Sequence, residues 1–272
     1  MPKTFHEEFV LIAGTGHLPN LVLEAALSAG ATATVLVLPG RNPDDFPDHR
    51  CLQINLGNYR EVFCQLAQDG LQQAVLAGGV DRPSIPSEGI PEIWAGDDSA
   101  IRSLLAPIET LGFEIAGVQD VVPELLASAG VVSRATPNKV DMGDAARAAG
   151  IVSALGRVDV GQAVVVVHGI CVAVESATGT DCMLATVGPA IERLFPHSSE
   201  RVGLLYKAAK PGQDMRVDVP VVGPETVRRV ARAGLRGIAV QSGGVMLLQR
   251  AEMIDLADMH GLFIWGIREE FD

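Results

Sequence analysis

Short apolar runs alternate with stretches of helical spacing through the first half of the chain. The pattern predicts, in order, strand 9–13, helix 20–29, strand 34–38, a weakly alternating strand 51–56, helix 59–67, strand 74–77, helix 98–111, strand 113–118 and a short helix from Pro123. Strands that alternate with helices in this way are typical of a parallel sheet with crossover helices. The first half therefore predicts a Rossmann-like parallel-sheet domain.

The second half mixes hairpin and helical patterns. We predict helix 141–155, strands 163–167 and 170–174, strand 203–208, helix 225–233, strands 238–240 and 245–248, helix 252–259 and strand 262–267. His168-Gly169 between two β-rich runs predicts a hairpin. Because residues 128–140 lose the regular pattern, we place the domain boundary there and predict an α/β protein with domains 1–133 and 134–272. The second domain is mixed α+β, and we expect a ligand cleft between the two.

Composition narrows the range of partners. The 272 residues are 48% hydrophobic and 20% charged, as in a globular α/β protein, and the formal net charge is -12. No run of Lys or Arg exceeds the pair Arg228-Arg229, so nucleic acid is not expected as a partner. An acidic protein that binds a phosphorylated ligand needs local cations, helix N-termini or a bound metal to hold the anion.

The cysteines and the N-terminus indicate the cellular compartment. Cys51, Cys64, Cys171 and Cys182 lack C-x-x-C spacing, which favours reduced thiols and an intracellular protein. The charged N-terminus resembles neither a signal nor a transit peptide. No apolar stretch reaches the ~18 residues that span a bilayer. We therefore expect a cytoplasmic protein whose contact with the inner membrane is at most peripheral.

Two glycine turns follow predicted strands of the first half. Gly14-Thr15-Gly16 precedes a helix, where backbone N–H groups and the helix dipole can hold a phosphate, and Gly78-Gly79 should lie beside it at the carboxyl edge of the sheet. The alternative is that the glycines only allow tight turns. Pro19 replaces the third glycine of a dinucleotide fingerprint, and no Asp or Glu stands at the end of strand 34–38 to bind a ribose hydroxyl, so an NAD-dependent oxidoreductase is disfavoured.

Polar side chains interrupt the apolar pattern of the second half at the ends of two predicted strands. They are Glu175, Thr180, Asp181, Lys207, Lys210, Gln213, Asp214, Arg216 and Asp218. Carboxylates from two loops can share a hard cation that neutralises a pyrophosphate and activates water, while lysine and arginine stabilise the leaving phosphate. The alternative is a solvated rim of weak ion pairs.

Several stretches also resemble the motifs of a known family, both in their residues and in their order along the chain. They are Leu11–Pro19, Leu76–Ser84, Gly96–Ala100, Asp159–Gln162, Gly179–Met183 after Glu175, Lys210–Asp214 and Arg216–Pro220. Together they resemble the LpxI type of UDP-2,3-diacylglucosamine pyrophosphatase over about the whole chain. The resemblance implies hydrolysis of this lipid-linked UDP-sugar to UMP and 2,3-diacylglucosamine 1-phosphate in lipid A biosynthesis, with Mg²⁺ or Mn²⁺, by a two-domain homodimer.

The resemblance also implies roles for single residues. It makes Asp218 the first candidate for metal ligand or water activator, with Asp181 as a second catalytic carboxylate and metal ligand, and with Lys210 offsetting charge. Binding of the substrate is expected at Thr180, Gln213, Gly14, Gly16, Gly78 and Gly79. Thr15 and Ala209 depart from the family pattern without touching this chemistry. A nucleotide-sugar or dinucleotide binding module without hydrolytic activity is the alternative function.

Overall fold

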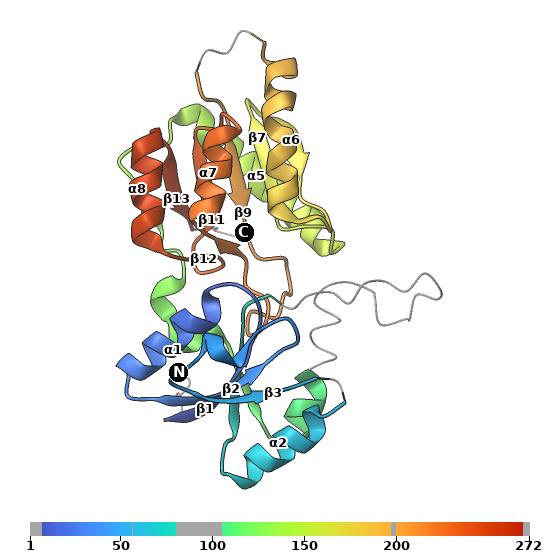
Figure 1. Cartoon of the computed structure of the whole chain (residues 1–272). Coiled ribbons are helices and arrows are strands. Elements are labelled where there is room, and N and C mark those ends of the chain that lie inside the picture. The colour runs from blue at the N-terminus through green and yellow to red at the C-terminus, as the bar shows by residue number, and fades with distance from the viewer. Residues whose placement is uncertain (1–6, 56, 80–104, 197–199, 269–272) are drawn as a thin grey trace. The chain divides into compact units, whose positions relative to one another are not determined.

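The chain forms two compact units, which the computed structural model describes over residues 7–55, 57–79, 105–196 and 200–268 (Figure 1). The first unit holds the described residues up to Glu124 and also the short segment Asp214–Asp218. The second unit holds Leu125–Gln213 and the chain from Val219 onward. Residues 125–133, predicted as part of the first domain, therefore belong to the second unit. The motif Gly96–Ala100 lies outside the described residues.

The first unit contains a five-stranded sheet in the order β3-β2-β1-β4-β5. Its strands are β1 (Glu8–Ala13), β2 (Thr32–Val37), β3 (Arg50–Gln53), β4 (Gln73–Ala77) and β5 (Glu114–Ala116). Every pair is parallel, so the carboxyl ends of all five strands meet at one edge. Strand β4 is buried along its whole length, as expected for an inner strand covered on both faces.

Helices cover this sheet on its faces. They are α1 (Leu18–Ser28), α2 (Tyr59–Gln68), the helical residues 105–110 and α4 (Val118–Val121), with 3-10 turns at Pro43–Asp45 and Pro123–Leu125. Helix α1 contacts α4, β2 and β4. Phe63 of α2 meets Phe113 edge to face, with ring centroids 5.0 Å apart, inside a core that also holds Leu105 and Ile108.

The second unit is built on a six-stranded mixed sheet in the order β6-β13-β11-β9-β7-β8. Its strands are β6 (Gly130–Val131), β7 (Ala163–Val167), β8 (Ile170–Val174), β9 (Leu204–Lys207), β11 (Gly237–Gln241) and β13 (Phe263–Ile267). Strand β11 is parallel to β9 and β13. Strand β6 pairs antiparallel with β13, and β7 pairs antiparallel with both β9 and β8. A separate parallel pair joins β10 (Val221–Val222) to β12 (Met246–Leu247).

Two cores cover the two faces of this mixed sheet. Its helices are α5 (Lys139–Arg157), α6 (Gly179–Leu194), α7 (Pro224–Arg232) and α8 (Arg250–His260). Val165 of β7 packs in a core with residues of α6, α7 and α8, and its neighbours Val164 and Val166 pack in a second core with α5. The continuous apolar run 163–167 is thus explained by burial on both faces.

Local chemistry sets where α5 begins and how the hairpin turns. Asn138 caps α5 by accepting hydrogen bonds from the backbone of Val140 and Asp141, and the Asp141 carboxylate accepts from the Asn138 amide. His168 and Gly169 both have positive φ, as a type I′ hairpin turn requires. The buried carboxylate of Asp144 on α5 accepts from both of their amides, at 2.9 and 2.5 Å.

The predicted fold class is confirmed, a parallel sheet followed by a mixed α/β unit, but several elements, among them α4 and β10, were not predicted. Helix α6 was not predicted, because Gly188 and Pro189 interrupt its apolar pattern. Residues 128–140 are not only a connection, since β6 lies among them and pairs with β13. In the described ranges, no helix is long and apolar enough to cross a membrane.

Candidate active site

The two glycine turns lie side by side at the carboxyl edge of the first sheet, as predicted. They follow the paired ends of β1 and β4, and Thr15 forms an antiparallel bridge with Gly79. The Thr15 amide donates to the Gly79 carbonyl at 2.7 Å, and the Gly79 amide returns a bond to the Thr15 carbonyl at 3.0 Å. A Cβ on Gly14 would lie only 2.9 Å from the Gly78 carbonyl carbon. Glycine is therefore required at this crossing for backbone to approach backbone.

This bridge limits which amides remain to bind a phosphate. The amides of Gly14, Thr15 and Gly79 already donate to backbone carbonyls. Among the described residues, none accepts from the amides of Gly16 and His17, which precede α1. These two N–H groups at a helix N-terminus are the donors that the first turn offers to an anion. The phosphate-binding role of the glycines stays a prediction.

The segment that carries Asp218 folds with this same unit. The Gln119 side chain, just after β5, donates from Nε2 to the Met215 carbonyl at 2.9 Å. Val217 packs against a core that includes Ile12 and Leu76 near the ends of β1 and β4. Asp218 itself is half-buried, and its amide donates to the Asp214 carbonyl at 3.1 Å. The structure thus brings the Asp218 segment to the sheet edge that bears the glycine turns.

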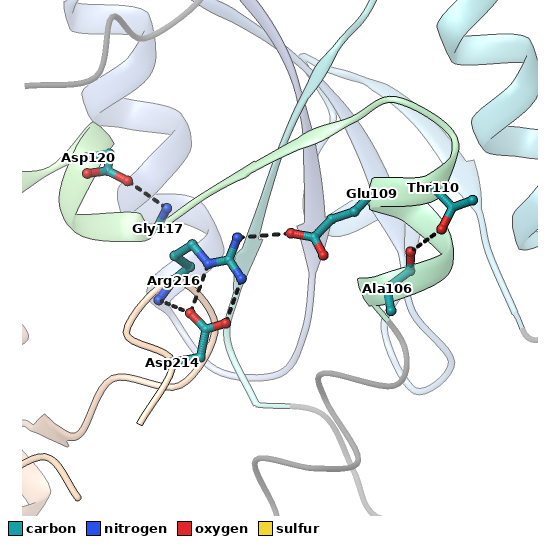
Figure 2. Close-up of polar contacts among 7 residues, drawn as sticks. All are labelled: Ala106, Glu109, Thr110, Gly117, Asp120, Asp214 and Arg216. Atoms are coloured by element: carbon teal, nitrogen blue, oxygen red, sulfur yellow. Dashed lines mark hydrogen bonds and ion pairs between the residues drawn. The ribbon is translucent and has the colours of Figure 1, made fainter. Parts of the chain in front are cut away.

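Arg216 holds this segment through two carboxylates (Figure 2). Its Nε and Nη2 bind the two oxygens of Asp214 at 2.9 and 2.7 Å, and its Nη1 binds Glu109 Oε1 at 2.9 Å. These bonds, first to Asp214 and then to Glu109, hold the pKa of the Arg216 guanidinium above its usual range. The guanidinium therefore stays charged at any working pH.

A hydrogen-bonded chain joins Lys207, Thr180 and Glu175 in the second unit. Lys207 Nζ at the end of β9 donates to Thr180 Oγ1 at 2.9 Å, and Thr180 donates to Glu175 Oε1 at 2.7 Å. The other carboxylate oxygen of Glu175 accepts from the Gln162 amide at 3.1 Å. Lys207 and Glu175 are 7% and 6% exposed, so burial makes this pairing necessary for both charges.

The same network extends to Lys210 and Gln213. Lys210 Nζ forms a 2.7 Å ion pair with Asp159, and the Lys210 amide donates to Gln213 Oε1 at 2.7 Å. Gln213 Nε2 reaches Gln162 Oε1 at 3.4 Å, which links this pair to the Glu175 chain. Lys210 and Gln213 are also buried. A solvated rim of weak ion pairs, the alternative for the polar cluster, does not describe its four buried members Glu175, Lys207, Lys210 and Gln213.

Asp181 lies apart from this network. It is on the first turn of α6, its side chain is 57% exposed, and its carboxylate is 3.2 Å from Arg229 Nε of α7. Arg229 is also paired with Glu225. Among the described residues, no group of three His, Cys, Asp or Glu side chains could hold a metal ion. The proposed metal ligands Asp181 and Asp218 stay a prediction.

Sequence reasoning missed some residues that hold the site together. Glu175 and Lys207 were grouped with the polar cluster. Their connection by hydrogen bonds to the Thr180 hydroxyl was not predicted, because helix α6, which carries Thr180, was not predicted. Glu109 and Gln119 carried no signal at all. Glu109 is a charged position on a helix, which is usually solvated, and Gln119 is a polar residue just after a strand.

Known proteins match both halves of the chain. Family models described as the LpxI N-terminal domain and the LpxI C-terminal domain match residues 8–125 and 128–265. A protein of Caulobacter vibrioides named UDP-2,3-diacylglucosamine pyrophosphatase LpxI is 33% identical over 269 residues, which cover 94% of this chain and 96% of that protein. With two domain models in sequence order and a relative matched nearly end to end, the chain belongs to the LpxI family.

Proposed function

We propose that the protein hydrolyses the pyrophosphate of UDP-2,3-diacylglucosamine to UMP and 2,3-diacylglucosamine 1-phosphate in lipid A biosynthesis. One structural observation supports this most directly. Three stretches that are far apart in the sequence, 159–162, 175–180 and 207–213, meet in a single, largely buried polar network. All three contain residues on which the family resemblance rests. A network with two buried lysines suits a substrate with two adjoining phosphates.

The reaction asks for a positioned water and for compensation of charge on the leaving phosphate. Water forms a new O–P bond, the bridging P–O bond breaks, and the leaving phosphate keeps the bonding electrons. Asp218 orients this water or accepts its proton, while Lys210 and Lys207 offset the negative charge that develops. Thr180 and Gln213 orient the phosphates, and the Gly16 amide offers a donor on the first unit.

We include Mg²⁺ or Mn²⁺ in this proposal, with Asp218 as the first ligand. Mg²⁺ is usually held by one or two carboxylates together with phosphate oxygens and waters, so a preformed cage of protein ligands is not required. A half-buried carboxylate such as Asp218 fits that need. Asp181 is the second candidate, although its pairing with Arg229 competes with a metal. When bound, the ion neutralises phosphate charge and lowers the pKa of a water.

We propose a homodimer that acts in the cytoplasm, where thiols stay reduced. Any contact with the membrane that supplies the acylated substrate is peripheral. Light scattering of the purified protein tests the dimer, and sedimentation with lipid vesicles tests the membrane contact.

The decisive experiment measures UMP release from UDP-2,3-diacylglucosamine. Wild type, Asp218→Ala and Asp218→Asn are compared, each with Mg²⁺ and with EDTA. We expect release that needs the metal and is lost in both variants, because neither side chain supplies a carboxylate. Asp255→Asn, which removes an exposed carboxylate from α8, is the matched control and should leave release unchanged.

Other outcomes have distinct meanings. If UMP release survives Asp218→Ala, the protein is still a hydrolase, but residues other than Asp218 carry out the reaction. If folded wild type binds the UDP-sugar in calorimetry without releasing UMP, the protein is a non-hydrolytic binding module instead. Water labelled with ¹⁸O identifies the phosphorus that is attacked, and we expect the label in the sugar phosphate.

A further inference from the structure

The five residues Asp214–Asp218 belong to the first unit although both flanks of the segment belong to the second. The segment has few backbone bonds of its own to fix it. The amides of Val217 and Asp218 both donate to the Asp214 carbonyl, at 3.1 Å each, which closes a tight turn. Such a turn sets the local shape of the segment but does not attach it to the sheet. Side chains of the first unit bond to the segment from outside the turn.

The first attachment runs through a guanidinium (Figure 2). Arg216 binds Asp214 with two parallel bonds and uses its remaining Nη1 to reach Glu109 on the helical residues 105–110. A bidentate pair fixes the plane of the guanidinium, so the Glu109 bond acts on the whole turn rather than on a flexible side chain. Glu109 thereby ties the turn to a helix of the first unit.

The second attachment comes from Gln119. Its Nε2 donates to the Met215 carbonyl at 2.9 Å, while its Oε1 is buried and has no partner among the described residues. A buried acceptor without a partner costs free energy, so folding stability alone does not favour glutamine here. The side chain amide also lies where a Cβ on residue 117 would stand, and that position is Gly117. The absence of a side chain at Gly117 thus leaves room for Gln119 to reach the Met215 carbonyl.

We infer that Glu109 and Gln119 are positioning residues for Asp218, which they hold at the carboxyl edge of the first sheet through the turn Asp214–Asp218. This inference rests on the proposed function, in which Asp218 acts on water or metal. Neither residue is assigned to touch the substrate. Their loss should therefore lower kcat through misplacement of Asp218 and leave KM nearly unchanged.

The kinetic test uses variants that keep side-chain volume. Glu109→Gln removes the charge that binds Arg216, and Gln119→Leu removes the donor to Met215. We expect each to lower kcat about 10-fold and the double variant about 100-fold, with KM within about 2-fold of wild type. Glu124→Gln, an exposed carboxylate of the same unit, is the matched control and should keep wild-type kcat.

A structural readout separates this inference from the proposed function. Hydrogen exchange at the amides of Val217 and Asp218 should become faster in Glu109→Gln and Gln119→Leu, while β1 and β4 stay protected. Wild-type kcat in the double variant, or a drop that Glu124→Gln shares, would overturn the inference and leave the hydrolase intact. Unchanged exchange at Val217 and Asp218 would overturn it as well. If wild type releases no UMP at all, the proposed function fails first, and exchange at this turn then reports the attachment alone.

Discussion

Because the two glycine turns are bridged backbone to backbone, we predict that Gly14→Ala strongly destabilises the first unit. The new methyl group would meet the backbone of Gly78 and Gly79, which has no side-chain freedom with which to move away. Forced overpacking costs about 1–3 kcal/mol, and each lost backbone hydrogen bond costs about 1 kcal/mol. Separating the turns breaks the two reciprocal bonds between Thr15 and Gly79. We therefore expect a loss of about 3–5 kcal/mol from the free energy of unfolding of the first unit.

Hydrogen exchange is the suitable assay, because it reports on each unit separately. Since every 1.4 kcal/mol is a factor of ten, the slowest amides of β1 and β4 should exchange at least about 100-fold faster in Gly14→Ala. The slowest amides of β9 and β11 in the second unit should be unchanged. Gly150→Ala is the matched control: nothing lies within 4 Å of its added Cβ on α5, and it should stabilise the second unit by about 1 kcal/mol. Unchanged protection of β1 in Gly14→Ala would refute the reasoning, since it would mean that the turns separate at no cost.

Two further predictions concern a buried charge and a partly buried thiol. Asp141 is 1% exposed and is paired with Arg236 Nε at 3.1 Å, so Arg236→Met should cost about 2–3 kcal/mol in urea unfolding, and adding Asp141→Asn should recover part of it. Burial raises the pKa of the Cys51 thiol, which leaves less thiolate at pH 8, so iodoacetamide should label exposed Cys182 before Cys51 in mass spectra. Labelling of Cys51 should accelerate as pH rises toward that raised pKa, and equal rates at pH 8 would contradict the burial.

Local sequence signals were sufficient for much of the fold. The apolar runs ending in glycine predicted β1 and β4 and their adjacent turns, because parallel strands bring their carboxyl ends together. The pair His168-Gly169 predicted the β7–β8 hairpin, because glycine readily adopts the positive φ that a type I′ turn needs at both central positions. The hairpin requirement is local, whereas the adjacency of the two glycine turns follows from the parallel pairing of β1 and β4.

The features that escaped prediction depend on distant contacts. Helix α6 tolerates Pro189 because Met183, Leu184 and Val187 are buried against the sheet, which sequence spacing does not show. The position of Asp214–Asp218 depends on partners about 100 residues earlier in the chain, Glu109 and Gln119. Of the predicted site residues, Thr180, Lys210 and Gln213 share one network, and Asp181 points elsewhere.

The turn Asp214–Asp218 also affects how the protein is made. The first unit is otherwise complete at Glu124, and about 90 residues separate that point from the segment that places Val217 in its core. At a synthesis rate of about 5–20 residues per second, the first unit waits roughly 5–20 seconds on the ribosome before its last piece is synthesised. During that interval, the apolar surface that Val217 will cover is open to water and to chaperones.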